Sequence, residues 1–339
     1  MPDIIGNTID RLCTVDARNR GMPHDFLTKL YDAARALVDD RPISIVAAER
    51  LVATLSKGDV VLVLTGAGLK PILPEGENDG PPGAAALSRA LYRGIGAVPV
   101  YVLEQHHARP VIASSQSLGV MVKQFDEAQK YGLGAAVELA PNTQEDVPQW
   151  VEQVLAHYQP KAIISTERLG PGNNGEMHSA TAMPLSAFDP TPGAAIDTSP
   201  LVDAARARGI LTIGIGDHGN EIGFGAIYDK VVDIVPKGEV MAATTPTDIL
   251  FPAMMSNWGC YGIEAALAFL LGRADLMHTP EQEERLLRDC LNAGGLEAAY
   301  CSTNFLVDGL EGESSMAVVQ LLGNIVRKNL EPPSRGLAH

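Results

Sequence analysis

The sequence has few cysteines, a shortage of basic residues and no long hydrophobic run. Four cysteines occur among 339 residues, and none forms a Cys-x-x-Cys pair or a metal-type spacing with histidine. This pattern excludes a disulfide scaffold and a zinc ribbon, and it is typical of reduced thiols. The N-terminal stretch MPDIIGNTIDRLC lacks the basic start and apolar core of a signal peptide. We therefore expect a cytoplasmic location.

Acidic residues outnumber basic ones. The chain has 26 Lys and Arg against 41 Asp and Glu, a formal net charge of −15. Nucleic acids and anionic membrane surfaces require concentrated positive charge, so neither is an expected partner. The longest apolar run, IEAALAFLL, is too short to cross a bilayer. A small acidic substrate is compatible with this charge, because a local arginine or helix N-terminus can attract it. The sequence leaves a homo-oligomer open.

Short β-branched runs alternate with helical patterns along the chain. This alternation predicts an α/β fold, a mostly parallel sheet with helices on both faces in a Rossmann-like three-layer architecture. We expect one domain over residues 1–330, with a helical N-terminal part at 1–55, and a tail at 331–339. A polar helix is expected near 115–131. The expected strands cover residues 59–66, 98–104, 134–140, 161–166, 210–216, 230–235 and 302–309.

Polar residues concentrate in four loops that follow expected strands or precede a helix. Ligand sites of parallel α/β folds lie at the carboxyl ends of the strands, so converging polar loops indicate a site there. Any one such loop can equally be a turn. His218 lies in the third loop, where a lone histidine is usually a solvated surface residue. The four loops carry, in order, Gly66, Gly68 and Asp79; Glu167, Arg168, Asn174 and His178; Asp217, Asn220 and Glu221; and Asn257.

The segment ILTIGIGDHGNEIGFG has two interpretations. Gly214, Gly216 and Gly219 match the G-x-G-x-x-G fingerprint of dinucleotide-binding folds. However, Asp217 and Glu221 would place negative charge beside a pyrophosphate, where a helix N-terminus should favour an anion. We therefore expect no NAD binding, and we interpret the segment as a glycine-bent loop that presents carboxylates.

Five segments, in the order ENDGPPGA, ERLGPGNNG, GIGDHGNEIGFG, SNWGCYG and VDGLEG, resemble the D-glutamate cyclase family, and more narrowly its cyclase-like domain. The resemblance covers about residues 40–328. It implies a lyase that converts D-glutamate to 5-oxo-D-proline and water. In this reaction the amine attacks the γ-carboxyl carbon. The site must therefore deprotonate an ammonium group and supply a proton or a cation to a carboxylate.

The resemblance and this chemistry together suggest roles for the loop residues. Arg168 can clamp a substrate carboxylate in bidentate fashion. Asp217 and Glu221 can bind a divalent cation, Mg²⁺ or Mn²⁺, through oxygen, or act as base and acid. The candidate catalytic residues are Asp79, Glu167, Asp217 and Glu221. The candidate substrate-binding residues are Gly66, Gly68, Arg168, Asn174, His178, Asn220 and Asn257.

The sequence departs from the familiar cyclases in two places. The first lies after the E-R-x-G segment and the loop glycine that follows it. The familiar cyclases carry an aromatic residue there, whereas this chain has Glu176, Met177 and His178. After VDGL, residues 311–315 replace a proline and a histidine. Both differences alter a pocket wall and leave the substrate open. A hydrolase that opens a small lactam or lactone is therefore one alternative, a non-catalytic module that binds a small acid or nucleotide is a second, and an NAD-dependent oxidoreductase is a third.

Overall fold

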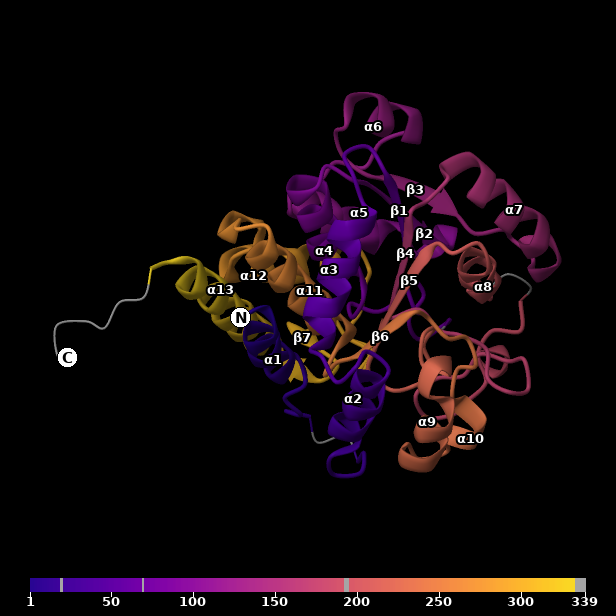
Figure 1. Ribbon diagram of the computed structural model, residues 1–339. Coiled ribbons are helices and arrows are strands. Elements are labelled where there is room, and N and C mark those ends of the chain that lie inside the picture. Colours follow the sequence, from indigo (N-terminus) through magenta and orange to yellow (C-terminus); the bar gives the residue numbers. More distant parts are fainter. Residues whose placement is uncertain (19–20, 69, 192–194, 333–339) are drawn as a thin grey trace.

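The computed structural model describes residues 1–18, 21–68, 70–191 and 195–332, and its centre is a six-stranded parallel sheet. The strand order is β3-β2-β1-β4-β5-β6 (Figure 1). The predicted α/β fold is confirmed. The strands are β1 (Val60–Leu64), β2 (Val98–Leu103), β3 (Ala136–Leu139), β4 (Ala162–Thr166), β5 (Leu211–Gly216) and β6 (Ile249–Pro252).

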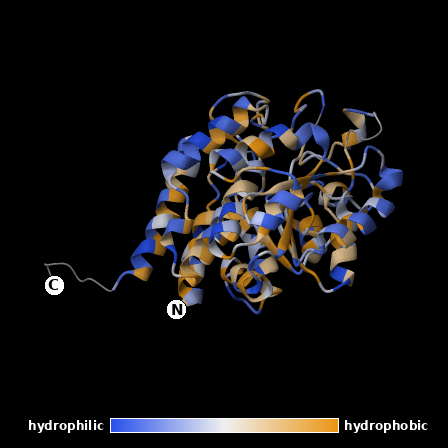
Figure 2. Ribbon diagram, turned by 90° about the horizontal axis from the view of Figure 1, so that it is seen from above, coloured by the Kyte–Doolittle hydropathy of each residue, from blue (hydrophilic) through white to orange (hydrophobic). Residues whose placement is uncertain are grey.

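Strands β1 and β2 are hydrophobic and buried along their whole length because both faces of the sheet are covered there. In β1, Val61 and Val63 belong to the core on one face, whereas Val60, Leu62 and Leu64 belong to the core on the other. Figure 2 shows hydrophobic residues along the central strands and hydrophilic residues toward the periphery. The sheet is thus the middle layer of the predicted three-layer architecture.

The face of Val61 and Val63 carries the thicker helical layer (Figure 1). Its central helix contains the longest apolar run of the chain, and residues 256–268 of that helix are all buried. A helix that is apolar all round belongs inside a core. The helices of this layer are α1 (Pro2–Cys13), α3 (Ile43–Thr54), α4 (Pro81–Gly94), α5 (Ala108–Ser117), the central α11 (Ser256–Leu270), α12 (Pro280–Asn292) and α13 (Gly312–Leu330).

The opposite face is covered by α7 (Val147–Tyr158) and α8 (Ser199–Ala207). In α7, Trp150, Val154 and Tyr158 recur every four residues and form the stripe that packs on the sheet. The remaining elements lie at the sheet edges and in connections. They are α2 (Phe26–Ala36), α6 (Phe125–Tyr131), α9 (Tyr228–Ile234), α10 (Gly238–Met241), the hairpin of β7 (Leu306–Val307) and β8 (Leu310–Glu311), and the 3-10 turns Gln105–His107, Gln144–Asp146, Leu185–Ala187, Gly225–Ile227 and Ala274–Leu276.

Three predictions of local structure are wrong. Residues 230–235, expected as a strand, lie mostly in α9, and the sixth strand is instead the unpredicted β6. A short β-branched run suits a helix or a strand, and its packing decides between them. Residues 302–309 contribute only β7, which pairs outside the main sheet. The helix expected near 115–131 is divided between α5 and α6. Of the expected tail at 331–339, residues 333–339 lie outside the described part of the chain.

The strand order reverses between β1 and β4. The chain builds outward from β1 through β2 to β3, and then returns to the other side of β1 to add β4, β5 and β6. The connections after β1 and β4 therefore diverge, which opens a crevice at the carboxyl ends of these two strands. The loops after β1, β4 and β5 and the start of α11 meet at this edge, so the fold itself defines where a ligand site belongs.

Candidate active site

A small cavity lies at the carboxyl ends of β1, β4 and β5. Its volume is about 190 Å³, below the roughly 300–1,000 Å³ typical of sites for drug-sized ligands. Its described lining residues include no lysine or arginine. The cavity therefore suits a small ligand with a positively charged group. The carboxyl, imidazole and amide side chains in its wall include those of Glu167, Asp217, His218, Asn220 and Asp308.

Asp79, from the loop after β1, caps the N-terminus of α11. Its Oδ2 accepts a hydrogen bond from the Ser256 N–H at 2.8 Å, and its Oδ1 accepts one from the Asn257 N–H at 2.8 Å. Nevertheless, burial and the charges of Asp308 and Asp217 raise the pKa of Asp79 well above its usual range. Asp79 is not among the described residues that line the cavity. It fixes the β1 loop on α11 and belongs to an acidic cluster beside the cavity.

Glu167 follows β4 in a left-handed backbone conformation, with φ at 47°. Such a φ is uncommon outside glycine and is found where the fold must aim a side chain. Ser256 Oγ donates a hydrogen bond to Glu167 Oε2 at 2.6 Å. Burial and the carboxylates of Asp217 and Glu221 raise the pKa of Glu167 well above its usual range. Glu167 is therefore a buried carboxyl group whose surroundings favour the protonated form.

Asp217 and His218 follow β5 and form a buried pair. The Nδ1 of His218 contacts Oδ1 of Asp217, and the imidazole stacks on the ring of Phe26. The expectation that His218 is a solvated surface residue is wrong, because only 8% of it is exposed. Although burial opposes it, the adjoining imidazole of His218 and the guanidinium of Arg18 lower the pKa of Asp217 well below its usual range. An ionised carboxylate that orients an imidazole is an arrangement suited to general base catalysis.

The Glu221 carboxylate fills the glycine loop from within. Its Oε1 accepts hydrogen bonds from the N–H groups of Asp217 at 2.9 Å and His218 at 3.0 Å, and its Oε2 accepts one from Gly219 at 2.8 Å. Successive N–H groups of this kind cradle the phosphate in nucleotide-binding loops. Burial and the charge of Asp217 raise the pKa of Glu221 to about 7. The chain's own carboxylate thus occupies the position that a pyrophosphate would need, while the absence of NAD binding stays a prediction.

The first two glycines of the fingerprint lie inside β5 and allow close packing. A Cβ on Gly214 would lie 2.8 Å from the Cα of Gly223, and a Cβ on Gly216 would lie 2.8 Å from the Cδ of Glu221. Gly219, with φ at 103°, makes the turn that brings the loop back against the strand. This geometry supports the interpretation of the segment as a glycine-bent loop that holds carboxylates.

Arg168 is buried in a network of its own. Its Nη1 and Nη2 donate to the two carboxylate oxygens of Glu104 at 2.5 and 2.8 Å. The remaining donors bind the carbonyl oxygens of Gly66 and Ile196 and the hydroxyl of Thr198. Although burial opposes it, the Arg168 charge lowers the pKa of Glu104 to about 2. All five N–H donors of Arg168 are therefore engaged within the protein, which does not fit the predicted clamp on a substrate carboxylate.

The glycines after β1 pack on a histidine. A Cβ on Gly68 would lie 2.2 Å from the Cε1 of His107, and a Cβ on Gly66 would lie 3.0 Å from its Cβ. Gly68 also lines the cavity, whereas Gly66 is not among the described lining residues. Of the two predicted binding glycines, Gly68 alone is in a position to contact a ligand in this cavity.

The predicted amide ligands occupy different positions. Asn257 Oδ1 accepts hydrogen bonds from the Gly80 and Gly83 N–H groups at 3.0 and 2.7 Å, so Asn257 joins α11 to the start of α4. Asn220 lines the cavity, and its Nδ2 donates to the carbonyl oxygen of His178 at 2.9 Å. Asn174 is exposed in a turn, where its Oδ1 accepts from the Glu176 N–H. Only Asn220 among these three can contact a ligand in the cavity directly.

Two groups of side chains have a spacing compatible with a metal ion. They are Asp217, His218 and Glu221, and Asp79, Asp217 and Asp308, with ligand atoms within 4.8 Å of one another. In the first group both Glu221 oxygens already accept backbone N–H groups. In the second, Nη1 of Arg18 contacts Asp217 at 2.7 Å and also Asp308. Oxygen ligands suit Mg²⁺ or Mn²⁺, but neither group fits an ion in this conformation, and the predicted divalent cation stays a prediction.

The sequence analysis did not identify Arg18, Ser256 or Asp308 as site residues. Asp308 lies within the VDGL segment that contributes to the family resemblance, so a signal for it was present. Arg18 lies in the connection between α1 and α2, 199 positions from its partner Asp217. No local pattern marks such a residue, because its role depends only on the tertiary structure.

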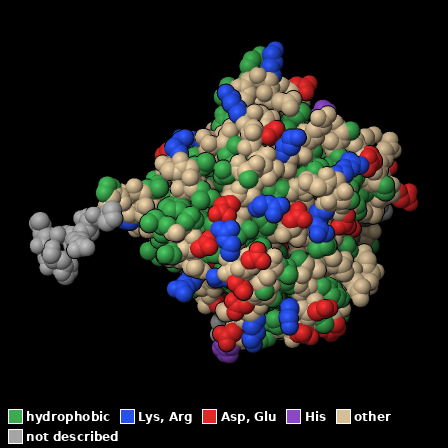
Figure 3. Space-filling view, viewed as in Figure 1, with side chains coloured by type: hydrophobic (Ala, Val, Ile, Leu, Met, Phe, Trp, Pro, Cys, Tyr) green, Lys and Arg blue, Asp and Glu red, His purple; other side chains and the backbone are tan. Residues whose placement is uncertain are grey.

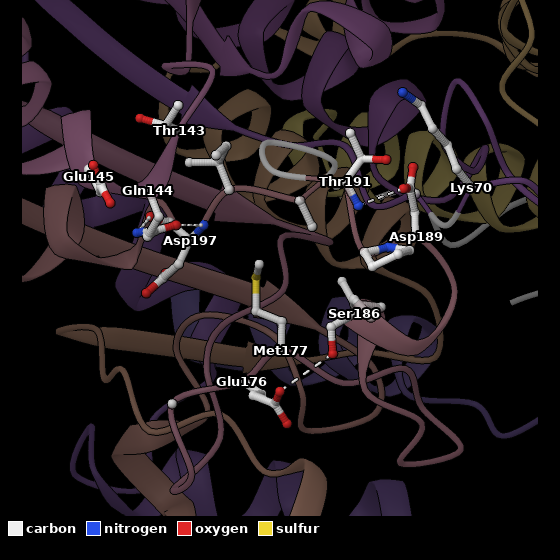
Figure 4. Close-up of a pocket in the computed structure, with 16 residues that line it drawn as sticks. Lys70, Thr143, Gln144, Glu145, Glu176, Met177, Ser186, Asp189, Thr191 and Asp197 are labelled. Atoms are coloured by element: carbon white, nitrogen blue, oxygen red, sulfur yellow. Dashed lines mark hydrogen bonds between the residues drawn. The ribbon is translucent and has the colours of Figure 1, made fainter.

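A larger groove adjoins the small cavity. It has a volume of about 560 Å³ and shares Gly68 and Leu185 with the cavity. Figure 4 shows Met177 and Ser186 in this groove, together with Lys70 and several acidic side chains. Glu176 and Met177, at one of the two departures from the familiar cyclases, line it. The departure therefore alters the wall of the outer groove.

On the face seen in Figure 3, Lys and Arg side chains lie among Asp and Glu side chains. A search of the described residues finds no helix with the length and apolar character needed to cross a membrane.

Taken together, the fold and the cavity define a doubly wound α/β protein with a small acid-lined cavity at the switch point of its sheet. The model of the family described as D-glutamate cyclase-like, C-terminal, matches residues 9–323, and the chain belongs to this family. Human mitochondrial D-glutamate cyclase is 28% identical over 214 residues, which cover 58% of this chain and 30% of the human protein. The matched segment is thus less than a third of that protein.

Two similar solved structures are both of YcaC. The Escherichia coli YcaC gene product, an octameric hydrolase of unknown specificity, is 13% identical with a TM-score of 0.22, covering 63% of this chain and 90% of that one. YcaC from Pseudomonas aeruginosa, with hexane-2,5-diol and covalent acrylamide, is 12% identical with a TM-score of 0.24, covering 64% and 93%. Likeness at these scores carries no argument about function or assembly.

Proposed function

We propose that this chain is a D-glutamate cyclase-like lyase, which converts D-glutamate or a related small amino dicarboxylic acid to a lactam and water. Membership of the family supports this class of reaction. The observation that carries the proposal is that one small cavity is lined by Glu167, a buried carboxyl group with a raised pKa, and by the carboxylate–imidazole pair of Asp217 and His218. A dehydrating cyclisation needs one group of each kind.

The reaction forms one bond and breaks one. The substrate nitrogen attacks the γ-carboxyl carbon, and a C–O bond of that carboxyl group breaks to release water. The nitrogen loses two protons as it passes from ammonium to lactam N–H, and the departing oxygen gains two. His218, oriented by Asp217, accepts the two protons of the nitrogen in succession, and Glu167 donates a proton to the departing oxygen each time, so that two protons pass from nitrogen to oxygen. Proton balance is restored when Glu167 recovers its proton from His218, directly or through water.

The charge of the site suits this substrate. Acidic lining attracts the ammonium group, and the protonated Glu167 approaches the γ-carboxylate without repelling it. The hydroxyl groups of Ser179 and Thr181 and the amide of Asn220 also line the cavity and can bind the carboxylates. Arg168 takes no part in this scheme and holds the loop after β4 to the end of β1 through Gly66 and to the end of β2 through Glu104.

The other acidic residues support the site rather than carry the chemistry. Asp79 connects the β1 loop to α11, and Glu221 shapes the β5 loop by binding three of its N–H groups. No step of the scheme passes through a metal ion. The cytoplasmic location and the homo-oligomer remain predictions.

One observation favours a second candidate, a hydrolase that opens a small lactam or lactone. The outer groove of about 560 Å³ adjoins the cavity and offers room for a substrate larger than glutamate. By microscopic reversibility the same acid and base can add water to a ring. The chemistry is shared, and the two candidates differ in the direction of the reaction and in the substrate.

The test is to incubate the purified protein with D-glutamate, L-glutamate, 5-oxo-D-proline and a panel of lactams and lactones, and to follow each by mass spectrometry. Loss of one water from an amino acid supports the lyase, and gain of one water by a ring supports the hydrolase. Binding without either change supports the non-catalytic module. Turnover that is unchanged in both Glu167→Gln and Asp217→Asn would show that the chemistry lies elsewhere.

A further inference from the structure

Arg18 reaches from an exposed segment into a buried cluster of acidic side chains. It follows α1, and residues 15–17 just before it are exposed, yet only 5% of its own side chain is exposed. Its Nη1 donates to Oδ2 of Asp217 at 2.7 Å and contacts Oδ2 of Asp308. Burial opposes a charged guanidinium, so its position depends on these two carboxylates.

The two partners of Arg18 belong to the oxygen cluster of Asp79, Asp217 and Asp308. Three carboxylates with oxygens within 4.8 Å of one another would suit a divalent cation. The guanidinium instead bridges two of the three. A metal ion and the Nη1 of Arg18 cannot both lie between Asp217 and Asp308, because each would need the same carboxylate oxygens.

The arginine also explains how these charges coexist inside the protein. Two ionised carboxylates at this separation repel each other strongly where the dielectric is low. One guanidinium beside both removes most of that repulsion. The charge therefore comes from the chain itself, and a guanidinium suits a buried ion pair because it is more weakly hydrated than an ammonium group.

We propose that Arg18 is the built-in cation of this cluster, holding the position between Asp217 and Asp308 that a divalent metal ion would otherwise take. The cluster is accordingly a metal site that the chain itself blocks, and the loss of one positive side chain opens it. The proposal concerns cation binding only. It stands or fails independently of the cyclase reaction, because its test needs no substrate.

The test measures binding of Mn²⁺ to the full chain by electron paramagnetic resonance and calorimetry. Arg18→Gln should bind Mn²⁺ at least about tenfold more tightly than the wild type, because a positive charge no longer competes. The matched control is Arg11→Gln, which removes the same charge from an exposed position on α1 and should bind like the wild type. Adding Asp308→Asn to Arg18→Gln should abolish the gain, which separates this cluster from other acidic groups on a chain of charge −15.

Three results would overturn the proposal. They are equal Mn²⁺ binding by the wild type and Arg18→Gln, a gain that persists with Asp308→Asn, and an equal gain in Arg11→Gln. If Arg18→Gln does not fold, as judged by its melting temperature, the proposal is tested with Arg18→Lys instead. The ammonium group keeps the charge, but it is more strongly hydrated and sits on a flexible stem, so it holds this buried position less firmly than the guanidinium does. Its Mn²⁺ binding should lie above that of the wild type, and binding equal to the wild type would count against the proposal.

Discussion

The hydroxyl group of Ser256, at the first position of α11, donates a 2.6 Å hydrogen bond to Oε2 of Glu167 at the end of β4. The N–H of the same serine binds Asp79 from the loop after β1. One residue at a helix N-terminus thus connects acids from both strands that flank the switch point. The position of the proposed acid is set by α11 as well as by its own strand.

Replacement of Glu167 by glutamine tests its role as the acid. The amide has no acidic proton to donate, so kcat should fall by about 10²-fold or more. The amide oxygen can still accept the hydrogen bond from Ser256, and a neutral amide replaces a neutral carboxylic acid. The free energy of unfolding should therefore change by less than about 1 kcal/mol. Ser256→Ala is the control, because it removes the hydrogen bond and leaves the acid in place. A smaller loss in Glu167→Gln than in Ser256→Ala would contradict the assignment.

Asp217 and His218 should act as one unit. Asp217→Asn and His218→Gln should each lower kcat by about 10²- to 10⁴-fold, and the double variant should lose little more than the worse single variant, because each depends on the other. The measurement is kcat for the four proteins, with melting temperatures as the check on folding. If Asp217→Asn folds normally and turns over within about threefold of the wild type, then Asp217 is only a turn residue.

The buried Glu221 makes stability depend on pH. Its pKa is raised from 4.5 to about 7 in the folded protein by burial and by Asp217. The folded chain therefore binds more protons than the unfolded chain between these values, and the free energy of unfolding should fall by up to about 3 kcal/mol as the pH rises across this window. The raised pKa values of Asp79 and Glu167 act in the same direction.

Denaturant titrations at the two ends of this pH window measure how steeply the free energy of unfolding changes with pH. Glu221→Gln should make this change smaller. This variant should also be less stable overall by about 1–3 kcal/mol, because an amide N–H would face a backbone N–H of the β5 loop. A slope that is the same in the wild type and the variant would mean that Glu221 is ionised in the fold.

The sequence was sufficient to predict five of the six strands of the sheet and the convergence of the polar loops that follow them. Hydrophobic runs that end in glycine-rich polar loops identify buried parallel strands, and parallel strands bring their following loops to one edge. Asp79, Glu167 and Asp217 are accordingly close together, as the loops that carry them predict. The misassigned strand at 230–235 shows the limit of this reasoning. Its β-branched residues suit either state, and β6 is too short to stand out.

The roles of single side chains could not be predicted in the same way. Arg168 has the residue type of a carboxylate clamp, and Glu221 has that of a catalytic acid. In the structure, the polar atoms of both side chains form hydrogen bonds with other groups of the protein. Which partner a polar side chain meets depends on the packing of loops distant in sequence. The same is true of Arg18, whose partners lie 199 and 290 positions away.

Arg168 allows a direct contrast between the clamp predicted from the sequence and a purely structural role. Arg168→Gln would leave the buried Glu104 carboxylate without its main partner, which typically costs about 3–5 kcal/mol. The melting temperature should therefore fall sharply. Arg168→Lys should also be destabilised, because an ammonium group cannot reproduce five donors in a planar fork.

The matched control is Arg208→Gln, whose carboxylate partner Glu152 is exposed. Its loss should change stability by no more than about 1 kcal/mol. The pH dependence adds a second readout. Without Arg168, burial should raise the pKa of Glu104 from its value of about 2, so Arg168→Gln should regain part of the lost stability as the pH falls and Glu104 takes up a proton. A variant that melts like the wild type at every pH but shows a large increase in KM would instead mean that Arg168 binds the substrate.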